Sequence, residues 1–265
     1  MIQLIVWIMA VLIVGSAVPA FPHGGNWRGG VNIEVVSDSG SSLPLISHRD
    51  LWQGKTKVIK KYLEARKNEN YGIVVHNGTP ERVGVVIAVD GRNIITGERS
   101  DLRNNEAMYI LNGHEQGRYD GWRTSRDEVH RFFFTESARS YTMRTFSDSS
   151  AMGVIAVAVF REKDRPRPLG SMNQDAAPAA PHAAGPSHGP EKAQADRSAG
   201  TGFGDSSYSP VVNVEFRSES IPVQKMLVKY EWREELCRKG LVRCEQEPQN
   251  RLWDEGRYAP YPPAK

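Results

Sequence analysis

The alternation of apolar and polar residues along the chain predicts a succession of short β-strands. The expected strands are residues 32–36, 71–75, 83–89, 93–96, 108–111, 129–135 and 153–160. The last of these, GVIAVAVF, is apolar at nearly every position, which is typical of a central strand covered on both faces. Because Gly, Asn, Asp and Ser separate the runs and few helical patterns intervene, the sequence predicts a mainly β fold, an antiparallel β-sandwich.

The pair Asp90–Gly91 lies between two β-branched runs. Such a pair predicts a hairpin with a type I′ turn, in which both central residues adopt positive φ. A turn role for Asp90 is therefore favoured over a catalytic carboxylate or a calcium ligand. Residues 55–66 are ambiguous, because the run KVIKKYLEA could pair as an edge strand or form a helix with one apolar face, composed of Val58, Ile59, Tyr62 and Leu63.

A break in composition divides the chain. Residues 165–200 are rich in Ala, Pro, Gly and Ser and almost free of large apolar residues, so they cannot bury enough surface to offset the entropy of ordering. We expect a disordered linker there, after a β-sandwich domain over residues 21–164. His182 and His188 lie in this stretch and are interpreted as solvated spacers.

Residues 201–265 are expected to form an appendage that docks on the β domain. Residues 211–216 alternate like a strand, and Ser220-Ile221-Pro222 is typical of a helix start. Beyond Val223 the apolar residues recur at helical spacing and predict a C-terminal helix; they are Met226, Leu227, Tyr230 and Cys237, with a neighbouring stripe of Val228, Trp232 and Leu236. The proline-containing residues 250–265 are expected to be an extended tail.

The first twenty residues resemble a signal peptide. Residues 4–18 are apolar or small, and Val18-Pro19-Ala20 places small residues where a signal peptidase cleaves, so the mature chain is expected to begin at Phe21. No Lys or Arg precedes the apolar run, which leaves an uncleaved membrane anchor as the alternative. Either form predicts export, to the periplasm, to the medium or to the outer side of the membrane.

Cys237 and Cys244 are the two cysteines of the chain, and in an oxidising compartment a close pair favours a disulfide over a metal site. Seven residues along a continuous helix separate Cα atoms by about 10 Å, whereas a disulfide tolerates at most about 7 Å. The helix must therefore end between them. Gly240, after Arg238 and Lys239, is the expected stop.

The formal net charge of +3 at pH 7 is spread along the chain. No dense block of Lys and Arg alternates with aromatic residues, so the composition argues against a nucleic-acid-binding protein.

Several segments together are similar to a family of exported, uncharacterised bacterial proteins. These segments are YGIVVHN, ERVGVVIAVDGRNIITGE, NEAMYIL, GWRTSRDEVHRFFFT, SAMGVIAVAVFRE, TGFG and KYEWREELCRKG. The resemblance covers most of the mature chain apart from the linker. It implies an exported β-sandwich protein and brings no activity, so no catalytic residue is carried over.

The candidate surface site is the stretch Gly121-Trp122-Arg123-Thr124 together with Asp127. Trp122 beside Arg123 could form a platform on which a sugar or an aromatic partner stacks. The alternative is that Trp122 plugs the end of the sandwich while Arg123 pairs with Asp127 or Glu128, which is favoured because large aromatic residues are mostly buried.

Other motifs give weaker signals. Residues 100–106 gather oxygen donors but lack the alternating acidic ladder and central Gly of an EF-hand loop. His48, His76, His114 and His130 lack the spacing of zinc ligands on one element, and neither a nucleophile elbow nor a phosphate loop occurs. No catalytic residue, metal site or cofactor is expected.

Two hypotheses follow. The first is a non-enzymatic binding or structural module whose partner is another envelope protein or a glycan. The second is a secreted hydrolase in which carboxylates converge only in the fold, with Asp127 and Glu128 as its candidates.

Overall fold

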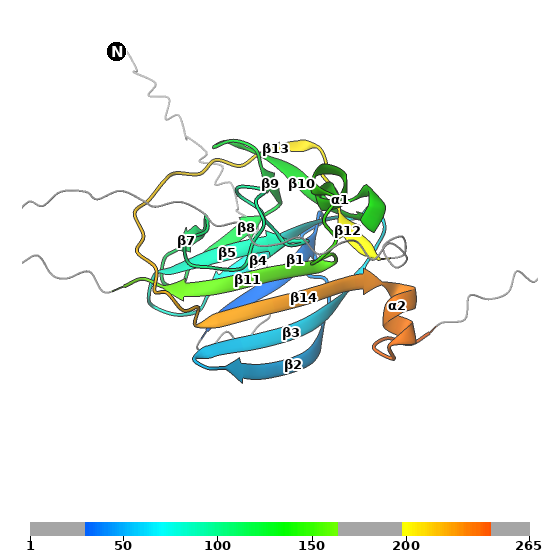
Figure 1. Ribbon diagram of the computed structural model, residues 1–265, viewed down its shortest axis with the longest axis horizontal. Coiled ribbons are helices and arrows are strands. Elements are labelled where there is room, and N and C mark those ends of the chain that lie inside the picture. Colours follow the sequence, from blue (N-terminus) through cyan, green and yellow to red (C-terminus); the bar gives the residue numbers. More distant parts are fainter. Residues whose placement is uncertain (1–29, 164–197, 245–265) are drawn as a thin grey trace, which may run out of the picture.

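Two β-sheets packed face to face make up the computed structural model, which describes residues 30–163 and 198–244 (Figure 1). The first sheet has the order β1-β4-β10-β12, with bounds Val31–Ser37, Asn70–Asn77, Glu128–Glu136 and Ala199–Thr201. At its margins β8 (Gln116–Tyr119) pairs with β4, while β9 (Gly121–Arg123) and β13 (Ser206–Tyr208) pair with β10.

The second sheet has the order β2-β3-β14-β11-β5-β6. The bounds of these strands are Leu45–Gln53, Thr56–Ala65, Gln224–Trp232, Val154–Arg161, Val83–Val89 and Arg92–Asn93, and β7 (Tyr109–Leu111) pairs with β5. All strand pairs are antiparallel except β3 with β14, which is parallel. The short helices are η1 (Ser137–Arg139), α1 (Tyr141–Phe146) and α2 (Arg233–Arg238). The predicted mainly β sandwich is confirmed.

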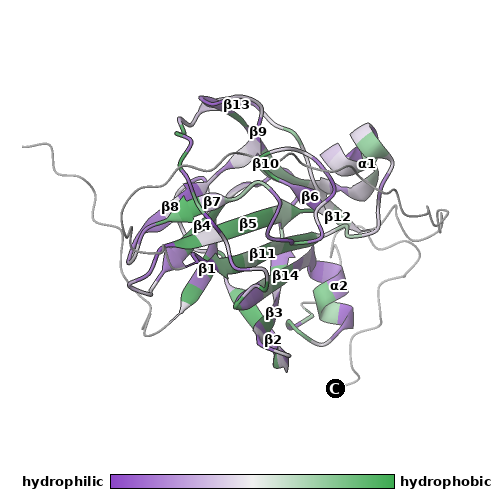
Figure 2. Cartoon of the chain, turned by 60° about the vertical axis from the view of Figure 1, so that its left-hand side comes forward, coloured by the Kyte–Doolittle hydropathy of each residue, from purple (hydrophilic) through white to green (hydrophobic). Residues whose placement is uncertain are grey.

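The core lies between the two sheets. The first sheet contributes every second side chain of β1, β4 and β10 to the core, and the second sheet contributes every second side chain of β5, β11 and β14. Strands β5 and β11 are also covered on their outer face, where Val86, Ala158 and Phe160 pack under Leu102 and Met108. Figure 2 shows both strands as hydrophobic along their length. The expectation that residues 153–160 form a central strand buried on both faces is confirmed.

The predicted hairpin at Asp90–Gly91 is confirmed. The two residues have φ of +48° and +78°, and Val89 pairs with Arg92 across the turn. The strand expected over residues 93–96 is wrong beyond Asn93, because the Asn93 side chain accepts the Ile95 N–H (2.9 Å) and turns the chain out of the sheet. The ambiguous residues 55–66 form strand β3. β3 is not an edge strand, because β2, which the sequence pattern did not predict, pairs with it on the side away from β14.

The helix predicted from Val223 is wrong over most of its length. Residues 224–232 form strand β14, whose Met226, Val228 and Tyr230 point into the core at a spacing of two. Apolar residues four apart satisfy both the helical and the strand period, and pairing on both sides with β3 and β11 selects the strand. The strand predicted for residues 211–216 is also wrong: Phe216 packs beside Gly84, but the segment joins no sheet.

The expected appendage is instead part of the sandwich. β14 lies between β3 and β11, and β12 extends the first sheet beside β10. Ala199 and Gly200, assigned to the linker from the sequence, belong to β12. The expected signal peptide, most of the linker with its two histidines, and the tail lie outside the described residues. Within the described ranges, no helix has the length and apolar character needed to cross a membrane.

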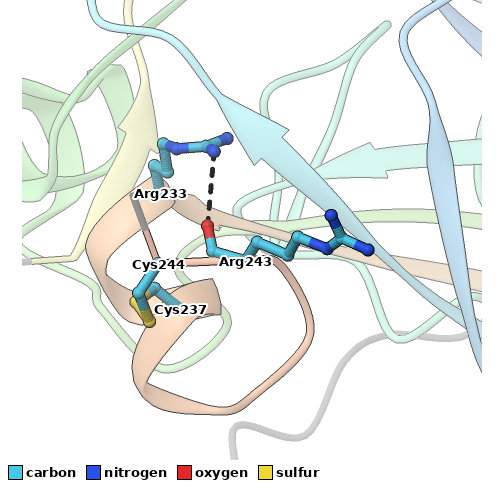
Figure 3. Close-up of a disulfide and its surroundings, with 4 residues drawn as sticks. All are labelled: Arg233, Cys237, Arg243 and Cys244. Atoms are coloured by element: carbon cyan, nitrogen blue, oxygen red, sulfur yellow. Dashed lines mark hydrogen bonds between the residues drawn. A yellow bond between two sulfur atoms is a disulfide. The ribbon is translucent and has the colours of Figure 1, made fainter. Parts of the chain in front are cut away.

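The C-terminal disulfide is confirmed. Helix α2 ends before Gly240, whose φ is +70°. The Gly240 N–H donates a hydrogen bond to the Cys237 carbonyl (2.8 Å), and the Leu241 N–H donates one to the Leu236 carbonyl (2.9 Å). This reversal brings Cys237 and Cys244 to a Cα separation of 5.2 Å. Figure 3 shows the bridge beside Arg233, which donates a hydrogen bond to the Arg243 carbonyl (3.3 Å). This bond holds the residue that precedes Cys244 against the start of α2.

Candidate functional site

Trp122, the centre of the site predicted from the sequence, is buried, with 2% of its surface exposed. Its indole N–H donates a hydrogen bond to the Gly202 carbonyl (3.0 Å), and its ring packs edge-on against Phe132 and tilted against Tyr141. The indole therefore has no open face on which a ligand could stack. Its burial agrees with the plug interpretation.

Arg123 holds the neighbouring loops together. Its guanidinium donates hydrogen bonds to the Tyr109 hydroxyl (2.9 Å) and to the carbonyls of Ser209 (2.8 Å) and Ser125 (3.1 Å). It is not ion-paired with Asp127, which is exposed. Among the described residues, the salt bridge expected with Asp127 or Glu128 is thus replaced by bonds to backbone carbonyls and to the Tyr109 hydroxyl.

The loop considered for calcium is closed by its own hydrogen bonds. The Glu106 carboxylate accepts the N–H groups of Asp101 (3.0 Å) and Arg103 (2.8 Å), and Asp101 pairs with the Arg103 guanidinium (3.5 Å). In the described part of the chain, no three His, Cys, Asp or Glu side chains gather as a metal site would require.

Asp90 has a second role besides its turn, because its side chain points into the protein and is 1% exposed. The carboxylate accepts hydrogen bonds from the N–H groups of Gly153 (2.8 Å) and Thr201 (2.7 Å) and from the Tyr230 hydroxyl (2.5 Å). The Thr201 hydroxyl in turn bonds to Tyr230 (2.6 Å) and to Tyr71 (2.8 Å). This buried network joins both sheets and the segments before and after residues 164–197.

Burial raises the pKa of Asp90 to about 6, against the lowering effect of the Tyr230, Thr201 and Gly153 hydrogen bonds and of the nearby Lys229 ammonium. Burial also raises the pKa of Tyr230 and of Tyr71. Asp90 does not line the hollow described below, and all of its hydrogen-bond partners named above are protein groups. We interpret the network as structural.

A hollow lies at the end of the sandwich where β2 and β11 end and β14 begins. It measures about 550 Å³ and is lined by Trp52, Lys55, Arg161, Lys163, Glu219, Ser220, Ile221, Pro222 and Val223. Trp52 is 68% exposed and Ile221 is 50% exposed. A volume between about 300 and 1,000 Å³ is typical of small-molecule sites.

The wall of the hollow is fixed by backbone hydrogen bonds. Lys163 N–H donates to the Arg217 carbonyl (2.7 Å), and Glu219 N–H donates to the Arg161 carbonyl (2.9 Å). On the other side the Thr56 hydroxyl donates to the Pro222 carbonyl (2.6 Å). Since these bonds tie β11 and β3 to the chain before β14, the hollow is formed without a ligand.

The charge at the hollow is predominantly positive. Three cations, Lys55, Arg161 and Lys163, line it together with one carboxylate, Glu219. None of these three cations takes part in an ion pair with the described residues. An exposed indole beside free cations can stack on a flat ring and pair with a negative group carried by that ring.

The sequence did not reveal this site, because its residues come from three separated segments that meet only when β14 enters the sheet. One local signal existed. Trp52 precedes the turn at Gly54 and Lys55, and a large aromatic residue beside an exposed turn is a candidate contact residue.

The fold and the hollow define a β-sandwich protein with a preformed, positively charged surface site. Comparison with protein-family models, with curated proteins and with solved structures finds no match for this chain.

Proposed function

We propose that this protein is a non-enzymatic binding module, acting outside the cytoplasm, whose hollow holds an acidic sugar of a glycan. The observation that carries the proposal is the exposed Trp52 indole in an open depression, beside three cations that form no ion pair with the described residues. The apolar face of a sugar ring stacks on an indole, and a carboxylate or phosphate on that ring pairs with Arg or Lys. The open, partly polar lining suits a hydrophilic ligand.

Binding has more support than hydrolysis at this position. Glycoside hydrolysis uses two carboxyl groups that flank the scissile bond, about 5 to 10 Å apart. The lining of the hollow contains one carboxylate, Glu219. Asp127 and Glu128, the carboxylates of the hydrolase hypothesis, do not line it, and Glu128 accepts a hydrogen bond from Thr124 (3.2 Å).

The proposal predicts that Trp52→Ala weakens binding of acidic sugars by about 10-fold, because the stacking surface is lost. The measurement is calorimetric titration with a panel of uronate-, sialate- and phosphate-bearing oligosaccharides and their neutral counterparts. The matched control is Tyr208→Ala, which removes another exposed aromatic ring, 78% exposed, from the first sheet.

The wild type and the Tyr208 variant should bind an acidic sugar in preference to its neutral counterpart and with equal affinity. All three proteins should unfold at the same temperature, because Trp52 is mostly exposed. Equal binding of acidic and neutral sugars, no binding, or full affinity in Trp52→Ala would each overturn the proposal.

A further inference from the structure

Residues 209–217 form an extended segment that belongs to neither sheet. They contain no turn or bend, and they run along the margin of the molecule between β13 and β14 (Figure 1). Val212 is 84% exposed and Val214 is 53% exposed. The alternation of β-branched residues that predicts a strand at residues 211–216 is therefore joined to an extended backbone, but no described strand pairs with it.

One edge of this segment is tied to the protein. The Ser209 and Val211 N–H groups donate hydrogen bonds to the carbonyls of Asp127 (2.8 Å) and Arg126 (2.9 Å). The Arg217 carbonyl accepts a backbone hydrogen bond (2.7 Å) from the chain that follows β11. In an extended chain the N–H and C=O groups of one residue point to the same edge, and successive residues alternate between the two edges. The odd-numbered residues therefore face the protein.

The opposite edge of the segment is free. It carries the N–H and C=O groups of the even-numbered Val212, Val214 and Phe216, which form no backbone hydrogen bond with the described residues. Phe216 is held through its ring, which packs beside Gly84 and under the Arg82 guanidinium. The free edge is thus fixed at both ends in the conformation that strand pairing requires.

The first strands of the two sheets, β1 and β2, are protected against such pairing, as natural sheet edges commonly are. On β1 the Leu43 N–H bonds to the Val35 carbonyl (2.7 Å), and the Gln224 side chain bonds to the Val31 carbonyl (2.6 Å). On β2 a shift of register interrupts the pairing with β3, and charged side chains line the strand. Residues 211–216 contain no Lys or Pro and one charged residue, so their free edge lacks this protection.

The free edge is complementary to a second copy of itself. In an antiparallel pair centred on Asn213, Val212 of each copy lies opposite Val214 of the other. Both residues are even-numbered, so their free N–H and C=O groups meet across the pair, and directly opposed β-branched side chains pack together. Phe216 lies opposite Pro210, whose carbonyl can still accept the Phe216 N–H.

The charges beside the segment favour the same register. In it Glu215 lies opposite the residue whose N–H bonds to Arg126, and Arg217 lies opposite the residue whose N–H bonds to Asp127. All four side chains are exposed, and none forms an ion pair with the described residues. Two strand spacings, about 10 Å, separate the backbones of each pair, a distance that Arg and a carboxylate side chain span together. Two-fold symmetry repeats both opposite-charge pairs.

We propose that residues 211–216 pair with the same residues of a second copy, so that the protein forms a two-fold symmetric dimer through this edge. The inference goes beyond the proposed binding function and does not depend on the hollow. Because each copy uses its own free edge, the pairing closes at two copies and does not continue into a fibre. The contact is small, so we expect a reversible dimer with a dissociation constant in the micromolar range.

The test is sedimentation equilibrium of the purified protein over concentrations from about 1 µM to about 1 mM, which span the expected dissociation constant. Val214→Pro removes an N–H from the free edge of each copy and should weaken the dimer by about 10-fold. The matched control is Asn213→Pro, which removes an N–H from the edge that faces the protein and should leave the dimer unchanged. Both positions are exposed, so both variants should unfold at the wild-type temperature.

Charge reversal tests the register. Glu215→Arg and Arg126→Glu should each weaken the dimer, because each places like charges together across the pair. The two substitutions combined should restore the wild-type dissociation constant. A combined variant that stays as weak as the single variants would overturn the pairing centred on Asn213.

A wild type that remains monomeric up to the highest concentration would overturn the proposal and leave the free edge to a different protein. A dimer that is as strong in Val214→Pro and in Glu215→Arg as in the wild type would also overturn it, because the contact would then lie elsewhere. Trp52→Ala should leave the dimer unchanged, since Trp52 lies on β2 and not in residues 209–217. Failure of the hollow and failure of the free edge are therefore distinguishable.

Discussion

Replacing Asp90 with alanine is expected to lower the free energy of unfolding by about 3 to 5 kcal/mol. The substitution leaves the buried Gly153 N–H, Thr201 N–H and Tyr230 hydroxyl without their acceptor. It also places alanine at a φ of +48°, a region that Asp tolerates better. Denaturant unfolding followed by circular dichroism measures the loss. A loss below about 1 kcal/mol would show that the network contributes little.

Asp90→Asn is the matched control, because it keeps the size and the turn preference of the side chain and removes its titration. In the wild type the folded chain holds the Asp90 proton up to a pH of about 6, whereas the unfolded chain releases it near the ordinary pKa of 3.8. The free energy of unfolding should therefore fall by roughly 3 kcal/mol as the pH rises from about 4 to about 6, and level off above that. The difference between wild type and Asp90→Asn should show this fall; a flat difference would contradict the raised pKa.

The second large effect concerns strand β14. Val228→Asp places an unpaired carboxylate at a core position that is 1% exposed, at an expected cost above about 4 kcal/mol. Because β14 lies between β3 and β11, the whole sandwich should unfold. The measurement is the dispersion of amide resonances from residues 30–163 in the NMR spectrum of the variant.

Leu227→Asp is the control on the same strand. Its side chain lies on the outer face opposite Lys60 and between Lys225 and Lys229, so a carboxylate there meets cations and water. This variant should remain folded. If Val228→Asp leaves residues 30–163 folded, the C-terminal segment is an appendage after all, and the topology is wrong.

The sequence was sufficient for the fold class and for the strands with strong local patterns. The runs that became β1, β4, β5, β10 and β11 combine period-two alternation or continuous apolar character with turn residues at their ends. The Asp90–Gly91 turn and the Gly240 helix stop were also predictable, because each depends on backbone conformations that a few residue types favour.

The predictions that were wrong share one physical cause, which is pairing between strands that are distant in the sequence. β14 carries apolar residues at spacings that fit a helix as well as a strand, and only its partners β3 and β11 decide between them. The same pairing forms the hollow, because it brings the start of β14 beside β3 and β11. Trp52, Arg161 and Ile221 are distant in sequence, and no local pattern indicates that they meet. Trp122, which does lie in a conspicuous local motif, is used for packing.

The most direct test of the central claim is to locate the ligand by NMR. In a titration of the ¹⁵N-labelled protein with the acidic oligosaccharide that binds best, the Trp52 indole N–H and the backbone amides of Lys55, Arg161 and Lys163 should show the largest shift changes. The Trp122 indole N–H, buried against Gly202, should not move. Shifts centred on Trp122, Arg123 and Asp127, with none at Trp52, would contradict the account.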